Sequence, residues 1–184
     1  PAAAGCGCVK GRGQGCGAGG AVFRPVGVHC KFGGGGAPRA RAIRIGDPLA
    51  HDTEGGPLAT RAQRDRMEAV VAESVDQGAI LHTGGCRPEG LDAGWYYRPT
   101  VLGCADQDVR STRVELFGPV MSVLRFDPEE EAVPLANAPE FALGAGLLHR
   151  DLSRVLLVPL PPSPRLFSLP PSPPPPPPPP LPAP

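Results

Sequence analysis

The sequence has few aromatic residues, no excess of charge of either sign and no long apolar run. Only 5% of its 184 residues are Phe, Trp or Tyr. The 18 basic and 18 acidic residues cancel, so long-range electrostatics favour neither nucleic acid nor an anionic membrane as a partner. No apolar run approaches the roughly 18 residues that a membrane-spanning helix needs. We therefore expect no nucleic-acid partner and no membrane partner.

The start of the chain and its cysteines also lack the features of a secreted or metal-binding protein. The chain begins at Pro1 without an initiator Met, a basic n-region or an apolar h-region. The six cysteines are Cys6, Cys8, Cys16, Cys30, Cys86 and Cys104. They include no CxxC unit, so a zinc site among the first four, or one that also uses His29, would lack the usual ligand spacing. We expect reduced thiols in a cytoplasmic protein rather than three disulfides, and no metal site.

What the sequence does contain is glycine and proline, 25 and 27 residues, concentrated towards its two ends. Residues 1–42 are rich in Gly and Ala, and this composition predicts a poorly ordered segment. Residues 43–155 have the composition of a globular domain. Residues 156–184 are dominated by proline, which donates no backbone hydrogen bond, so a disordered tail in the polyproline II conformation is expected.

The central region alternates helix and strand signals. Thr60 can cap a helix that extends to about Gln77 and carries Met67, Val70, Val71, Ser74 and Val75 on one face. Strands are expected at "AILHTGG" (79–85), "RPTVL" (98–102), "VMSVLRF" (120–126) and "GAGLLHR" (144–150). The alternation predicts an α/β fold with a mainly parallel sheet and flanking helices.

A further helix is expected directly after the strand at 120–126. Asp127 is the predicted N-cap, with Pro128 at the first helical position and acidic residues in the first turn. Pro134 falls inside this helix, where a proline kinks the backbone or costs about 3 kcal/mol.

Four blocks of the sequence, taken in order, resemble a known family. They are "RIGDPLAHDTEGGPL" (44–58), "GWYYRPTVL" (94–102), "VELFGPVMSVLRFDPEEEAVPLAN" (114–137) and "GAGLLHRDLSRV" (144–155). Together they resemble the C-terminal half of the catalytic domain of aldehyde dehydrogenases, and "FGPVMSVL" is most similar to the betaine-aldehyde and 4-trimethylaminobutyraldehyde enzymes. The resemblance implies a partial catalytic domain of an oxidoreductase that uses NAD, or NADP, to convert a small-molecule aldehyde into a carboxylate.

The same resemblance implies the residues of a catalytic site. Gly13-Gln14-Gly15-Cys16 matches the family's Gly-Gln-x-Cys turn, which puts Cys16 at the position of the nucleophile. Glu115 matches the glutamate that holds the nicotinamide ribose hydroxyls, and Phe117 matches the aromatic residue beside the nicotinamide ring.

Two of these positions also have readings that do not depend on the resemblance. Cys16 can instead be a small residue of a flexible glycine-rich segment. Arg66, on the predicted helix, is either solvated or a basic group near the cofactor.

The resemblance also implies that several catalytic parts are missing. In the family the oxyanion-binding Asn, the general-base Glu and the dinucleotide-binding sheet precede the cysteine, whereas this chain begins 15 residues before Cys16. We therefore expect the isolated chain to be inactive. Beyond residue 155 the proline tract replaces the family's oligomerisation segment, so the homo-oligomer of the full-length family is not assumed for this chain.

Two other functions stay open at this stage. The proline tract has the composition of segments that bind SH3, WW or profilin domains, although Arg165 directly follows Pro164 and no basic residue has the usual spacing beside a PxxP motif. The chain can also be a truncated, non-catalytic subunit that folds onto a full-length partner.

Overall fold

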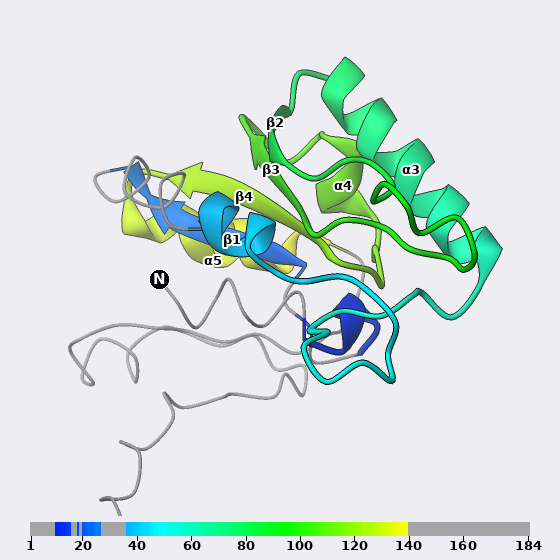
Figure 1. Cartoon of the computed structure of the whole chain (residues 1–184). Helices are drawn as coiled ribbons and strands as arrows, with labels where there is room; N and C mark the ends of the chain where they lie inside the picture. Colours follow the sequence, from blue (N-terminus) through cyan, green and yellow to red (C-terminus); the bar gives the residue numbers. More distant parts are fainter. Residues whose placement is uncertain (1–9, 16–17, 19, 27–35, 140–184) are drawn as a thin grey trace, which may run out of the picture.

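The structure, a computed structural model, describes residues 10–15, 18, 20–26 and 36–139, which Figure 1 shows in colour. Its elements are η1 (Lys10–Gly13), β1 (Ala21–Pro25), α3 (Arg61–Asp76), β2 (Ile80–Thr83), β3 (Thr100–Cys104), α4 (Arg110–Arg113), β4 (Val120–Phe126) and α5 (Glu129–Asn137). A short helix over residues 36–41 precedes α3. The strand predicted at 144–150 and the proline tract lie outside the described residues.

The four described strands form one sheet in the order β1-β4-β3-β2. The central strand β4 is parallel to both of its neighbours, β1 and β3, and only β2 is antiparallel, where it pairs with β3. The predicted α/β fold with a mainly parallel sheet and flanking helices is therefore confirmed.

The strand β1 lies inside the segment for which composition predicted poor order. It pairs along its length with β4, from Ala21 opposite Ser122 to Pro25 opposite Phe126. The prediction was wrong for β1 and for the helix over residues 36–41, because the hydrogen bonds and packing of a neighbouring strand stabilise a segment whose own composition is weakly structured. The division of the chain at residues 42 and 155 stays a prediction.

Both faces of the central strands β3 and β4 are buried. On one face Leu102, Cys104, Val120 and Leu124 pack with the α3 residues Met67, Val70 and Val71. On the other face Val101, Met121 and Val123 pack with Ala40 of the short helix. Because side chains alternate along a strand, a strand covered on both faces is apolar at almost every position, as the central strands are.

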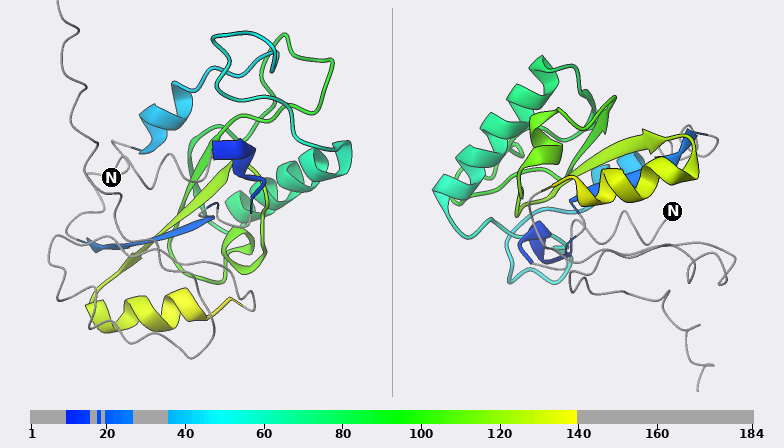
Figure 2. Two further views of the ribbon diagram at one scale, coloured as in Figure 1. Left: turned by 90° about the horizontal axis from the view of Figure 1, so that it is seen from below. Right: turned by 180° about the vertical axis from the view of Figure 1, so that it is seen from behind.

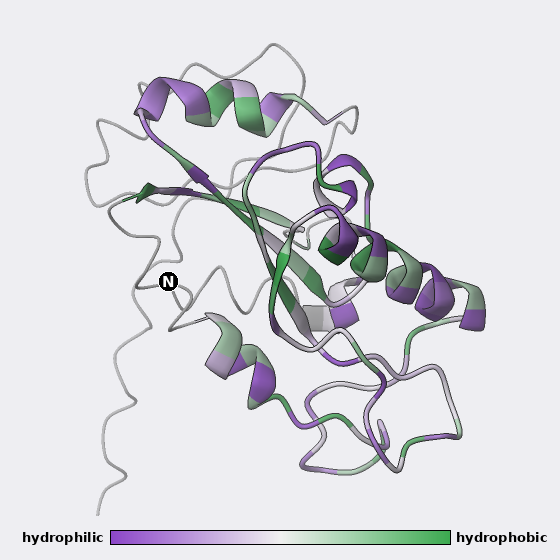
Figure 3. Cartoon of the chain, turned by 90° about the horizontal axis from the view of Figure 1, so that it is seen from above, coloured by the Kyte–Doolittle hydropathy of each residue, from purple (hydrophilic) through white to green (hydrophobic). Residues whose placement is uncertain are grey.

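The helices lie on opposite sides of the sheet. Figures 2 and 3 show α5 on one side of β1 and β4 and the helix over residues 36–41 on the other, and Figure 3 shows the hydrophobic colour along parts of the strands between them. Among the described residues no helix is long and apolar enough to cross a membrane.

Helix α3 begins where the sequence predicts. The Thr60 hydroxyl accepts a hydrogen bond of 3.1 Å from the Gln63 amide, as an N-cap does. Of the predicted apolar face, Met67, Val70, Val71 and Ser74 are buried. Val75 is 40% exposed, so its assignment to the buried face was wrong. At one residue beyond Ser74 it has already rotated by about 100° around the helix.

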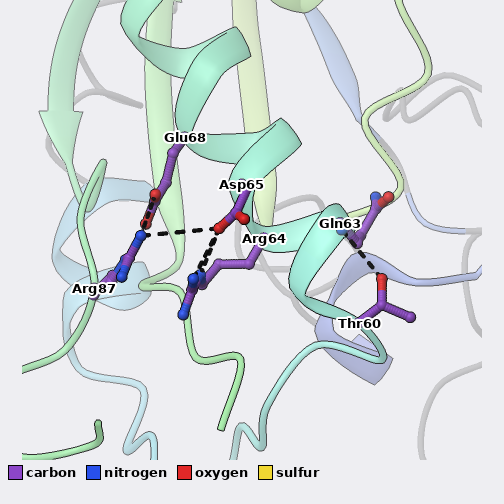
Figure 4. Close-up of polar contacts among 6 residues, drawn as sticks. All are labelled: Thr60, Gln63, Arg64, Asp65, Glu68 and Arg87. Carbon is purple, nitrogen blue, oxygen red and sulfur yellow. Dashed lines mark hydrogen bonds and ion pairs between the residues drawn. The ribbon is translucent and has the colours of Figure 1, made fainter.

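The loop between β2 and β3 is held against α3 by polar contacts. The guanidinium of Arg87 donates to both carboxylate oxygens of Glu68, at 2.5 and 2.8 Å, as Figure 4 shows. These hydrogen bonds lower the pKa of Glu68. The ring of Trp95 lies beneath the guanidinium groups of Arg61 and Arg64, at 4.8 and 5.3 Å from its centroid.

Several element boundaries differ from the predictions by one or two residues, and β2 (Ile80–Thr83) is shorter at both ends than the strand predicted at 79–85. β3 begins at Thr100 rather than at residue 98, because Pro99 has no N–H to donate to a strand ladder. α5 begins at Glu129 with Pro128 as its N-cap, and Asp127 is not the cap. The backbone N–H of Asp127, the residue before this cap, donates to the Glu131 carboxylate at 3.1 Å.

The three acidic residues of the first turn of α5 lie where the sequence predicts them. The helix continues through Pro134 to Asn137. The four-residue helix α4 was not predicted, since a single turn of helix leaves almost no periodic pattern in a sequence.

Candidate functional site

The predicted site residues fall in two short segments that are far apart in the sequence. Cys16 itself lies outside the described residues, but Gln14 and Gly15, directly before it, are described. Glu115 and Phe117 lie in the loop of residues 114–119, which connects α4 to β4. Both segments contact the region where α3 begins.

The loop of residues 114–119 is held by two side chains of α3. The amide nitrogen Nε2 of Gln63 donates to the carbonyl oxygens of Leu116 and Phe117, at 2.7 Å in each case. One helical turn further on, Nη2 of Arg66 donates to the carbonyl oxygen of Glu115, also at 2.7 Å. Three consecutive carbonyl groups of the loop are therefore bound to one helix.

The side chains of this loop point in different directions. Leu116 is buried in the core with 4% of its surface exposed, whereas Phe117 is 40% exposed. The φ angle of Phe117 is +50°, in the left-handed region, which costs an L-residue roughly 1–2 kcal/mol. Glu115 is half-buried. A carboxylate and an aromatic ring two residues apart in this loop are thus at least partly accessible.

The turn before Cys16 is attached to the residues that lead into α3. The side-chain oxygen Oε1 of Gln14 accepts a hydrogen bond of 3.0 Å from the backbone N–H of Ala59. Nη1 of Arg12 donates to the carbonyl oxygen of Pro57 at 2.8 Å. The structure therefore brings Gln14, two residues before Cys16, to the same end of α3 as the loop that carries Glu115 and Phe117.

Two contacts of this region were not predicted from the sequence. Gln63 stands three residues after Thr60, a spacing that predicts a capping box in which the glutamine bonds back to the cap residue. Its side chain bonds instead to Leu116 and Phe117, 53 and 54 positions away. Arg66, expected to be solvated or near the cofactor, is exposed but bonds to the carbonyl of Glu115.

The two described cysteines differ sharply in access to solvent. Cys86 is exposed, whereas Cys104 is buried with 3% of its surface exposed. Burial raises the pKa of Cys104, whose sulfur lies 3.8 Å from the hydroxyl of Ser111. A buried thiol with a raised pKa supplies little thiolate, so Cys104 does not qualify as a nucleophile.

Alkylation of the native chain should distinguish these two thiols. We expect iodoacetamide to modify Cys86 quickly and Cys104 at least about 100-fold more slowly, because the thiolate of Cys104 forms rarely and is covered by the core. The measurement is mass spectrometry of the cysteine-containing peptides over time. In denaturant both thiols should react at similar rates, and a native Cys104 that reacts as fast as Cys86 would contradict the buried position.

No metal centre is formed by the described part of the chain. Among residues 10–15, 18, 20–26 and 36–139, no group of three or more His, Cys, Asp or Glu side chains could hold a metal ion. The functional groups that this site presents are the backbone carbonyls of residues 115–117, the carboxylate of Glu115 and the ring of Phe117.

Comparison with known proteins shows the family to which the chain belongs. Residues 2–159, which are more than half of the chain, match the aldehyde dehydrogenase family. The chain belongs to the aldehyde dehydrogenase family. The family predicted from the four sequence blocks is thereby confirmed.

Among curated aldehyde dehydrogenases, similar relatives are the betaine aldehyde dehydrogenases of two bacteria. The protein of Mesorhizobium japonicum is 42% identical over 144 residues, which are 77% of this chain and 30% of the relative. The protein of Brucella anthropi is 44% identical over 118 residues, 63% of this chain and 24% of the relative. The chain thus spans about 30% or less of the length of these relatives.

Solved structures of aldehyde dehydrogenases show the same fold. The Mycobacterium tuberculosis enzyme in complex with NAD+ superposes with a TM-score of 0.80 at 30% identity, over 83% of this chain and 32% of that chain. An aldehyde dehydrogenase from Bartonella henselae gives a TM-score of 0.81 at 31% identity, over 84% of this chain and 33% of that chain.

Proposed function

We propose that this chain is the part of an NAD(P)-dependent aldehyde dehydrogenase, of the betaine-aldehyde type, that carries the nucleophile and contacts the nicotinamide end of the cofactor. One observation carries the proposal: the turn before Cys16 and the loop with Glu115 and Phe117 meet at the start of α3. The names of the curated relatives support the substrate class, and the NAD+ complex of a structural neighbour supports the cofactor.

In the proposed reaction the thiolate of Cys16 attacks the carbonyl carbon of the aldehyde. A carbon–sulfur bond forms, the carbonyl oxygen takes up the negative charge, and a thiohemiacetal results. A bound nicotinamide cofactor would supply the hydride acceptor. Loss of a hydride from this carbon and of the proton from the thiohemiacetal hydroxyl leaves a thioester on Cys16. Water then hydrolyses the thioester on Cys16, which releases the carboxylate and regenerates the thiol. Since a free cysteine has a pKa near 8.5, the site must favour the thiolate form of Cys16.

The residues of the loop fit the nicotinamide end of such a cofactor. The carboxylate of Glu115 can accept two O–H hydrogen bonds, which suits the two hydroxyl groups of a ribose. The exposed ring of Phe117 offers an apolar face to a planar heterocycle. The three carbonyl groups bound to α3 fix the backbone from which both side chains project.

The proposal assigns the general base, the oxyanion donor and the dinucleotide-binding sheet to polypeptide outside these 184 residues, since the chain spans about 30% of its relatives. Residues 1–184 alone should therefore form no NADH. A role as a truncated subunit, binding of SH3, WW or profilin domains by the proline tract, homo-oligomer formation and a cytoplasmic location stay predictions.

A chimera tests the proposal. Residues 2–159 replace the matching segment of the Mesorhizobium japonicum betaine aldehyde dehydrogenase, so that the relative supplies the remaining catalytic parts. We expect the chimera to form NADH from betaine aldehyde and NAD+, and Cys16→Ser to lower the rate by more than about 1,000-fold. Glu115→Gln should raise the KM for NAD+ more than it lowers kcat.

The matched control for the nucleophile is Cys86→Ser, which removes an exposed thiol and should leave the rate of the chimera unchanged. Equal rates for the chimera and its Cys16→Ser variant would rule out Cys16 as the nucleophile. A folded chimera that forms no NADH would rule out the proposed function as a whole.

A further inference from the structure

Residues 59–63, which lead into the first turn of α3, contact both parts of the proposed site. We propose that Gln63 is a positioning residue, an inference that rests on the proposed function. Its side chain holds the backbone of Leu116 and Phe117 in the conformation that presents Glu115 and Phe117 to the cofactor. We also infer that Gln14 attaches the turn directly before Cys16, called here the cysteine turn, to Ala59, the residue before the cap of this helix.

The geometry of the Gln63 contact explains why one side chain can impose this conformation. A glutamine amide nitrogen has two N–H groups, one for each of the two carbonyl oxygens, of Leu116 and Phe117, that lie 2.7 Å from Nε2 of Gln63. In an extended chain successive carbonyl groups point in opposite directions, so one amide cannot bind both. Helix-like dihedral angles at the intervening residue, of either hand, turn successive carbonyl groups to the same side. The left-handed φ of +50° at Phe117 meets this requirement.

Packing prevents the loop from relaxing towards the helix if this contact is lost. Gly118 lies directly on Met67, since a Cβ atom at position 118 would be 2.6 Å from the Met67 sulfur. Met67 is fully buried, so a shift of the loop towards α3 would have to displace its side chain within the core. Movement away from α3 is therefore the less hindered direction, and it would take the side chains of Glu115 and Phe117 with it.

The position of Gln63 is itself fixed by the turn that Gln14 contacts. The backbone N–H of Gln63 donates to the Thr60 hydroxyl at 3.1 Å, as Figure 4 shows. The backbone N–H of Ala59, the residue before this cap, donates to Gln14 at 3.0 Å. A continuous path of short contacts thus runs from the turn before Cys16, through the cap of α3, to the backbone of Phe117.

Limited proteolysis of residues 1–184 tests the positioning role directly. Chymotrypsin cleaves after aromatic residues but binds its substrates in an extended conformation, so the left-handed, hydrogen-bonded Phe117 should resist it. Gln63→Met keeps the length of the side chain and removes both donors, and it should raise the rate of cleavage after Phe117 about 10-fold. Gln63→Lys keeps a donor of similar reach and should restore much of the protection. If Gln63 contributed only packing, the rates of cleavage after Phe117 in Gln63→Met and Gln63→Lys would be similar.

The control is Ala62→Met, which adds a methionine at an exposed neighbouring position and removes no contact, and it should leave the cleavage rate unchanged. Gln14→Met should raise cleavage after Phe117 by a smaller factor, about 3-fold. Wild-type rates in Gln63→Met would overturn the positioning role, and wild-type rates in Gln14→Met would overturn the link to the cysteine turn.

Kinetics of the chimera separate this inference from the proposed function. Gln63→Met should raise the KM for NAD+ about 10-fold with a smaller change in kcat, because the cofactor contacts are displaced while the nucleophile remains. If cleavage after Phe117 rises but the KM for NAD+ does not, Gln63 holds the loop and the assignment of Glu115 and Phe117 to the cofactor is wrong. If neither changes in an active chimera, the proposed function stands and the positioning role is overturned.

Discussion

Replacing Leu102 with alanine should lower the free energy of unfolding by about 2–5 kcal/mol. Leu102 is fully buried in the centre of β3, in the cluster between the sheet and α3. Its strand is paired on both sides, with β4 and with β2, so the backbone cannot collapse into the cavity that the substitution leaves. A loss of this size is a large share of the 5–15 kcal/mol that typically stabilises a domain.

Urea denaturation of the two proteins measures this effect, provided that the slope of the transition stays the same. The matched control is Ile80→Ala in the neighbouring edge strand β2, where the side chain is 63% exposed. It should change the free energy of unfolding by less than about 1 kcal/mol, because little apolar surface is removed from the interior. Equal losses for Leu102→Ala and Ile80→Ala would contradict the burial pattern of the sheet.

Substituting Gly84 with alanine should destabilise the chain by well over the roughly 1–2 kcal/mol that the left-handed conformation alone costs an L-residue. Gly84 follows β2 and has a φ of +78°. A Cβ atom there would lie 2.3 Å from the carbonyl oxygen of Pro99 and 2.7 Å from Cα of Thr100. Both contacts are with backbone at the start of β3, which cannot rotate away as a side chain can.

Gly90 provides the matched control, since it has a similar φ of +73° and no atom within 4 Å of the position of its Cβ. Gly90→Ala should therefore show the conformational cost alone, roughly 1–2 kcal/mol. The difference between the two variants, measured by thermal or urea denaturation, isolates the steric overlap at Gly84. If Gly84→Ala is no less stable than Gly90→Ala, the close approach of Gly84 to the backbone of Pro99 and Thr100 is incorrect.

Elements with strong local signals were predictable. α3 was recognised from the cap at Thr60 and from its apolar spacing, and it begins and ends within a residue of the prediction. β4 was recognised from its continuous apolar run and spans residues 120–126 as expected. In both cases the pattern that stabilises the element is contained in its own residues, so no knowledge of its neighbours was needed.

Elements that depend on a distant partner were not predictable. β1 lies in a glycine-rich segment and is stabilised by β4, about 100 residues later in the chain. The hydrogen bonds that decide its place are made by a strand whose position the local sequence does not specify.

In the candidate site, too, some features were predictable from the sequence and others depend on tertiary contacts. The family resemblance assigned roles to Cys16, Glu115 and Phe117, and these assignments stay proposals. Gln63 carried only the local pattern of a capping box, yet its side chain bonds to a loop more than 50 residues away. Contacts of this kind follow from the packing of α3 beside the loop, which no periodicity in the sequence encodes.

By itself, therefore, the sequence determined the family, the α/β class and the strongly patterned elements, because these depend on motifs and on the local spacing of apolar residues. Only the tertiary structure decided that β1 joins the sheet and that Phe117 adopts a left-handed conformation. It also decided that Gln14 and Gln63 connect two distant segments at the start of α3. The physical reason is that hydrogen bonds between segments far apart in sequence form only when the packed core has set their backbones side by side.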